Sequence, residues 1–163
     1  MALLLPSQAA KPLRVIGAVA TSDKATSKMT FQATTTVTEV TTTETNSSAT
    51  NFVVTSTAGF ASNDVVVLER ASDGNWNTAT VWGTSGGTNL ILSTAGPNLF
   101  GMTAFAGDRI GKLGEAVTLY GCNCTVSYQS ECLFIADQGR SVYVTWDGTS
   151  ACSIDSLAYK YGE

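Results

Sequence analysis

Four cysteines are the residues whose type and spacing could do chemistry: Cys122, Cys124, Cys132 and Cys152. Four thiolates can bind Zn²⁺, but a single residue separates the first two, where zinc sites usually have two or more, and the last two are 20 apart. In an oxidising environment the four could instead form two disulfides. A third state is reduced thiols used as small buried apolar side chains, which is common for free cysteine. We favour the reduced state, with no metal and no cofactor, and the other two stay open.

Acid–base chemistry has few candidate residues. The chain has no histidine, which excludes Ser-His-Asp and Cys-His catalysis and zinc sites with histidine ligands. Carboxylates could still meet in space, and the candidates are Asp64, Asp73, Asp108, Asp137, Asp147 and Asp155. Four of these lie beside Gly or Asn in turn sequences, where aspartate accepts backbone hydrogen bonds. We therefore expect a protein that is not an enzyme and has no catalytic residue.

Charge is scarce along the whole chain. Charged residues make up 13% of the 163 residues, about half of the usual share, and the net charge is −4. The nine Lys and Arg residues are scattered, whereas proteins that bind nucleic acids cluster them. Because a lone monomer depends on surface charge for its solubility, we expect a homo-oligomer, or a protein packed against another protein. We expect no direct nucleic-acid partner.

No stretch of the sequence predicts a membrane segment. The run Met1–Pro6 contains three leucines, but no positive charge precedes them and the run is too short for the centre of a signal peptide. Nothing approaches the roughly 20 apolar residues of a spanning helix. We expect no membrane partner and synthesis in the cytoplasm without export.

Alternation of apolar and polar residues predicts the elements that must position these side chains. The clearest strand is Lys28–Val37, in which the residues on one face are Met29, Phe31, Ala33, Thr35 and Val37. The Gly-free stretch 18–58 is rich in Thr and Val, which favour strands, and no window of 12 residues has a helical period. Beyond Gly111 the alternation resumes, with a predicted hairpin turn at 137–140. The sequence predicts an all-β fold with an antiparallel sandwich or barrel-like body.

Turn-rich segments divide the chain into three predicted parts. Residues 1–12 are interrupted by Pro6 and Pro12 and are expected to form an extended N-terminal arm, either a floppy terminus or a strand that adds to a neighbour's sheet. Residues 13–50 plus 112–163 are expected to form a β-sheet body, and 51–111 a small β-barrel-like unit inserted into it. A single sandwich that uses all the strands is the alternative.

The region 51–111 consists of short β-branched runs separated by turns. Gly59-Phe60 is followed by three small residues and then by Asp64-Val65-Val66, and Ala106-Gly107-Asp108 precedes a closing strand. This order of parts resembles a small β module found in bacteriophage virion structural proteins, among them head decoration, minor capsid and tail proteins. The resemblance covers a little over a third of the chain. It implies a non-enzymatic structural protein of the virion whose partner is the major capsid protein or another virion protein.

Within that class, we expect first a head decoration or minor capsid (cement) protein that stabilises the shell as a symmetric oligomer. A tail-tube, neck or fibre-attachment protein is the alternative in the same class. From a different class, the alternative is an adhesion or carbohydrate-binding β domain. The sequence leaves open the head or tail location, the oligomeric symmetry, the partner and the host.

The tryptophans and the N-terminal leucines are the candidate contact residues. Trp76 is flanked by Asp, Gly and Asn turn formers and is expected at an exposed loop tip, where it would contact a partner. Trp82 and Trp146 lie in predicted strands and are expected in the core. In the predicted arm, further candidates for interaction are Leu3, Leu4 and Leu5.

Overall fold

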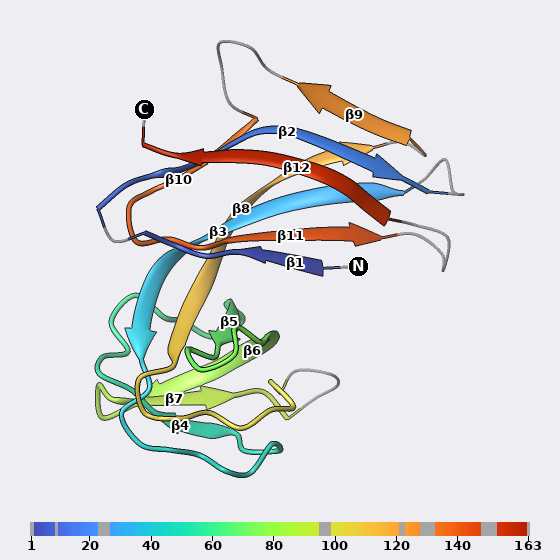
Figure 1. Cartoon of the computed structure of the whole chain (residues 1–163). Helices are drawn as coiled ribbons and strands as arrows, with labels where there is room; N and C mark the ends of the chain where they lie inside the picture. The colour runs from blue at the N-terminus through green and yellow to red at the C-terminus, as the bar shows by residue number, and fades with distance from the viewer. Residues whose placement is uncertain are drawn as a thin grey trace. The chain divides into compact units, whose positions relative to one another are not determined.

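The structure is a computed structural model that describes residues 2–8, 10–22, 27–94, 99–120, 123–127, 133–147 and 153–162. Within these residues the chain forms strands and turns and no helix, which confirms the predicted all-β fold (Figure 1). The runs rich in Val, Thr and aromatic residues favour extended backbone, and Gly, Asn and Asp end them.

The described strands are β1 (Ala2–Leu5), β2 (Leu13–Thr21), β3 (Lys28–Glu39), β4 (Asn51–Val53), β5 (Val65–Glu69), β6 (Trp76–Ser85), β7 (Asn89–Leu92), β8 (Arg109–Tyr120), β9 (Asn123–Ser127), β10 (Phe134–Ala136), β11 (Val142–Asp147) and β12 (Ser153–Tyr161). They belong to two compact units. The first unit consists of Met1–Thr34 and Gly114–Glu163, and the second of Thr35–Leu113.

The first unit is an antiparallel sandwich (Figure 1). One of its sheets contains β1, β11, β3 and β8 in that order, and the other has β2 at its centre, with β12 on one edge and β9 and β10 on the opposite edge. Trp146 is buried between the sheets as predicted, and its indole N–H donates to the carbonyl of Thr21 at 2.9 Å. The buried core of this unit is Leu5, Leu13, Val15, Ala18, Ala20, Met29, Phe31, Ala136, Val142, Val144 and Trp146.

The second unit is a small closed barrel. Its strand order is β3-β8-β5-β6-β7-β4, with the parts of β3 and β8 that lie within Thr35–Leu113. The end of β3 then pairs back onto β4, because Thr41 donates its N–H to the carbonyl of Val53 and Thr55 donates to the carbonyl of Glu39, both at 2.9 Å. Closure leaves no open sheet edge at β4. The enclosed core is Val40, Phe52, Val54, Phe60, Val66, Leu68, Ala79, Val81, Leu90, Leu92, Phe100, Ala104 and Ile110.

The strand β3 belongs to both units, and this changes its buried face. Met29 and Phe31 are buried in the sandwich, as the alternation predicts, but farther along the strand the buried residues are Thr34 and Thr38. The two halves of the strand are packed in different units. The prediction that a single alternating face is buried over 28–37 is therefore wrong beyond Ala33. For the same reason residues 35–50, expected in the sheet body, belong to the barrel unit, whose limits are 35 and 113 and not 51 and 111.

The turn at 137–140 forms, but it does not make the expected hairpin. Arg140 donates its N–H to the carbonyl of Asp137 at 3.1 Å, and Gly139 has a φ of 70°. However, β10 pairs with β2, whereas β11 pairs with β1 and β3. The turn therefore carries the chain from one sheet of the sandwich to the other. Turn residues specify a local reversal, and the sheet that each flanking strand joins depends on distant partners.

Residues 2–5 do not form a free arm, which corrects the expectation for 1–12. They form β1, which pairs with β11 of the same chain in an unbroken register from Ala2↔Thr145 to Leu5↔Val142. Leu5 is 3% exposed and is part of the sandwich core, because an uncharged apolar strand gains both backbone hydrogen bonds and burial there.

Candidate functional site

Trp82 is the most exposed large apolar side chain among the described residues, at 69%. It lies in β6, where the pairing with β7 shifts register between Val81 and Gly83. A bulge of this kind adds a residue to one strand and redirects its side chain. Because Val81 is buried in the barrel core, alternation directs Trp82 away from that core. The expectation that Trp82 is a core residue is therefore wrong.

Apolar residues on the neighbouring strands extend the exposed surface around Trp82. Val65 on β5 is exposed and pairs with Thr80, two residues before Trp82. Ile91 on β7 is half-buried and pairs with Gly83, the residue after Trp82. These strands are consecutive in the barrel wall, in the order β5-β6-β7. We call Val65, Trp82 and Ile91 the Trp82 surface, and none of the three carries a charge.

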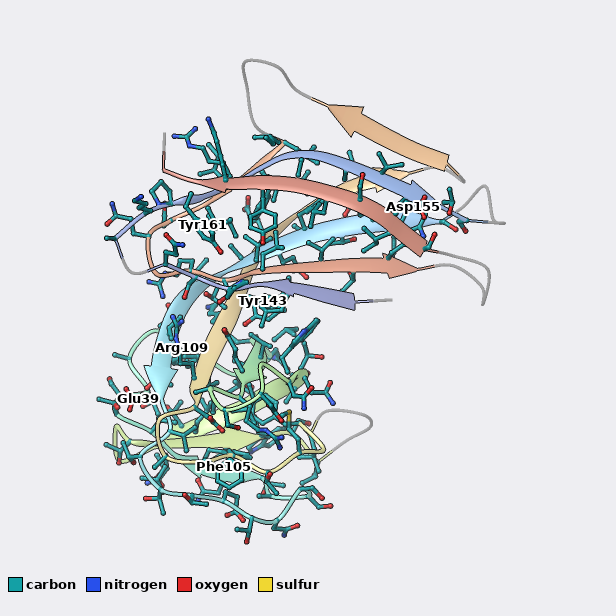
Figure 2. All side chains as sticks on the ribbon, in the orientation of Figure 1. Glu39, Phe105, Arg109, Tyr143, Asp155 and Tyr161 are labelled. Carbon is teal, nitrogen blue, oxygen red and sulfur yellow. The ribbon has the colours of Figure 1, made fainter. Side chains whose placement is uncertain are left out.

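A groove lies elsewhere on the barrel unit and has a volume of about 380 Å³. Its lining includes Glu39 at the end of β3 and Arg109 at the start of β8 (Figure 2). The Thr38 hydroxyl in the same lining accepts a hydrogen bond from the Ser56 N–H at 3.1 Å, so it stabilises the backbone. Among the described residues of the lining Glu39 is the one carboxylate, so they include no carboxylate pair for acid–base catalysis.

Asp64 and Asp108 hold backbone in place. Asp108 is 2% exposed, and its carboxylate accepts hydrogen bonds from the N–H groups of Ala71 at 2.9 Å and Phe105 at 2.8 Å. Asp64 accepts from the Ala61 N–H at 2.7 Å and forms an ion pair with Lys112 at 2.9 Å. Both carboxylates therefore fix loops of the barrel, and their surroundings are those of structural residues.

A charged cluster stabilises the turn between β5 and β6. Asp73 forms a hydrogen-bonded ion pair with Arg70 and accepts the Asn75 N–H at 3.0 Å. The pKa of Asp73 is lowered to about 2, mainly by the hydrogen bond from Arg70 and next by the bond from the Asn75 N–H. The same guanidinium lies 5.8 Å from the centre of the Phe105 ring, a cation–π distance. Arg70 therefore joins this turn to the loop that contains Phe105.

The predicted contact residues occupy different environments from those expected. Trp76 is the first residue of β6, opposite Glu69, and is half-buried; the tip of the turn precedes it, at Gly74 with a φ of 69°. In β1, Leu5 is buried and Leu4 is half-buried. The side chain of Leu3 lies outside the described residues. Trp76 belongs to the second unit, and the leucines belong to the first.

Metal binding by the cysteines stays a prediction from the sequence. Cys122, Cys132 and Cys152 lie outside the described residues, as does the side chain of Cys124. The part of the chain that the structure describes contains no group of three or more His, Cys, Asp or Glu side chains placed to hold a metal ion. It also contains no helix with the length and apolarity that crossing a membrane requires.

Comparison with known proteins finds no match. No protein family, no curated protein and no solved structure matches the chain. Its function therefore has to be inferred from its own residues and their arrangement.

Sequence reasoning missed the Trp82 surface, although a signal for it was present. Ala79 and Val81 are buried and alternate with Thr80 and Trp82. Because apolar residues occupy both phases at Val81-Trp82, these two residues alone do not decide which of them faces inward. The buried Ala79, two residues before Val81, lies in the phase that directs Trp82 away from the core.

Proposed function

We propose that the chain is a non-enzymatic structural protein of a phage-like virion. Within that class we propose a head decoration or minor capsid (cement) protein, which stabilises the shell through subunit contacts. It binds the major capsid protein or another virion protein and works as a homo-oligomer. The observation that carries the proposal is the Trp82 surface, an exposed and uncharged patch on the wall of a closed barrel.

The exposed indole provides a large free energy for association. A tryptophan side chain buries about 150–250 Å², and Trp82 is 69% exposed. About 100–170 Å² is thus available to a partner, which corresponds to roughly 2.5–4 kcal/mol at about 25 cal/mol per Å². Tryptophan is also enriched among the residues that dominate binding energy at interfaces. A strand in a closed barrel is already ordered, so little entropy is lost on binding.

The residues of the phage-like motif support the proposal because each has a role in building the barrel. Gly59 has a φ of 87°, which favours glycine, and an added Cβ would lie 3.2 Å from the side chain of Thr36. Phe60 is buried in the barrel core. Asp64 and Asp108 hold loops through their carboxylates. The motif therefore encodes a compact β module, as expected for a subunit that acts through its shape.

The proposal is tested by sedimentation with phage-like particles made without the chain. The wild-type protein should co-sediment at a saturable level, and Trp82→Ala should bind at least about 30-fold more weakly, which corresponds to a hot-spot loss of about 2 kcal/mol. Phe105→Ala is the matched control, since it removes an exposed aromatic ring outside the Trp82 surface. Absence of saturable wild-type binding contradicts the proposal.

The head location is tested against the tail alternatives on the same particles. Cryo-electron microscopy of particles with the bound protein should reveal extra density on the shell. Density on the tail tube, the neck or a fibre attachment point would replace the head assignment with one of those alternatives.

Trp82 also favours the second candidate function, adhesion or carbohydrate binding. A flat, exposed indole can stack on the apolar face of a sugar ring, and polar residues such as Asn51 and Asn89 lie on strands adjoining the Trp82 surface. Titration with neutral oligosaccharides would then quench tryptophan fluorescence in the wild-type protein and not in Trp82→Ala. Saturable quenching together with no particle binding would favour this second function.

A further inference from the structure

The segment Ala2–Gln8 occupies a slot that recognises it at several points. Its first four residues form β1, in register with β11, and Leu5 is buried in the sandwich core. Three hydrogen bonds hold the rest of the segment: Tyr161 Oη donates to the carbonyl of Pro6 at 2.7 Å, Ser7 donates its N–H to Ser141 Oγ at 3.2 Å, and Gly139 donates its N–H to the carbonyl of Gln8 at 2.9 Å. The slot therefore binds a seven-residue segment by its backbone and by one core leucine.

Gln8 and Lys11, in the connection between this segment and β2, form an isolated antiparallel bridge. Its hydrogen bond from the Lys11 N–H to the Gln8 carbonyl has a length of 3.5 Å, which is at the limit for such a bond. The following residue, Pro12, has no N–H to donate. Separating Gln8 from Lys11 breaks this bridge and leaves every contact of the slot intact.

We propose that two copies of the chain exchange this segment, so that Ala2–Gln8 of each copy occupies the slot of the other. Every hydrogen bond of the slot and the burial of Leu5 are retained between copies, and only the Gln8–Lys11 bridge opens. Exchange of an identical element is a low-cost route to a dimer. The occupant is a second copy because the slot already fits this sequence in register, and the segment carries no charged side chain to oppose the approach of a second copy.

The inference deepens the proposed function, since it rests on the self-association expected of a shell-binding protein. Exchange depends on concentration because it joins two chains. Copies held close together on a particle would therefore exchange more readily than dilute free copies. In this way the exchanged segment would link neighbouring subunits around the shell.

The test replaces each member of the register pair Ala2↔Thr145 with cysteine, one in each of two copies that carry different tags. Ala2→Cys and Thr145→Cys proteins are unfolded, mixed, refolded at high concentration and then oxidised. Exchange predicts a covalent heterodimer whose amount rises with concentration, and peptide mapping separates this link from those of the native cysteines. Ala2→Cys mixed with Lys160→Cys is the matched control and should give no such link, because Lys160 is exposed and pairs with Arg14 in the sheet of the first unit that does not contain β1.

A double variant with both cysteines in one chain completes the design. If it links within the chain while the mixed copies never link, exchange is refuted. If no link forms in either sample, the register of β1 itself is wrong and the proposal falls with it. A linked dimer that does not bind particles would leave the exchange standing and remove the proposed function, so the two can fail separately.

Discussion

Replacing the two tryptophans Trp82 and Trp146 with alanine should separate binding from folding. Truncating a fully buried large side chain costs about 3–5 kcal/mol. Trp146 is 1% exposed and also loses its hydrogen bond to Thr21, so we expect the full cost there. Trp82 is 69% exposed, so it contributes about a third of its area to the fold. Scaled by that third, Trp82→Ala should lower the free energy of unfolding by about 1–1.5 kcal/mol.

The measurement is urea denaturation followed by far-ultraviolet circular dichroism, with the same variants then tested for particle binding. Phe105→Ala serves as the control for removal of an exposed aromatic ring. We expect Trp82→Ala to lose about a third as much folding stability as Trp146→Ala and to bind about 30-fold more weakly than the wild type, a hot-spot loss of about 2 kcal/mol. The reasoning is refuted if Trp82→Ala loses as much folding stability as Trp146→Ala, or if it binds particles as tightly as the wild type.

Three further outcomes are expected. Asp108→Ala should lower the free energy of unfolding by about 2–4 kcal/mol, because the N–H groups of Ala71 and Phe105 lose their buried acceptor; Asp108→Asn should cost less in the same denaturation assay, and equal costs would contradict this role. NMR titration should give Asp73 a pKa of about 2, so its stabilising effect is complete above about pH 4 and is lost as the pH falls towards 2. Arg70→Ala should raise that pKa part of the way to 3.8. An unchanged pKa in Arg70→Ala would refute the assigned cause. Circular dichroism of the purified chain should show less than about a fifth helix, below the usual third of globular proteins, and a higher content would contradict the all-β fold.

Local patterns predicted the elements of this fold well. The strand beginning at Lys28, the turn at 137–140 and strands beyond Gly111 all form. Each depends on neighbours in sequence, through alternation, β-branched residues or turn formers. Burial of Trp146 was also predictable, because Val142, Val144 and Trp146 alternate on one face of their strand.

Features that depend on distant partners were not predictable. β1 looks like a Pro-broken arm in sequence, and it is ordered by β11, more than a hundred residues away. The buried face of β3 changes where the strand passes from the sandwich unit to the barrel unit. The alternation of residues in a strand does not encode which strand it pairs with. It also does not encode which core each half of the strand enters.

The candidate site depends on one such feature. Turn formers around Trp76 indicated a loop tip, but the turn closes earlier and Trp76 begins a strand. Trp82 looks like a core residue by composition, but it lies out of phase with the buried Ala79 and Val81 and is the most exposed large apolar side chain described. Which face of a strand is buried depends on the elements that cover it, so the sequence of one strand does not reveal it.

The most direct test of the central claim is the protein composition of purified phage-like particles from the cell that encodes the chain. Quantitative mass spectrometry of gradient-purified particles measures how many copies are present per copy of the major shell protein. A structural virion protein predicts a fixed ratio that survives further purification. Absence of the chain from the particles, or a ratio that falls with each purification step, would contradict the account.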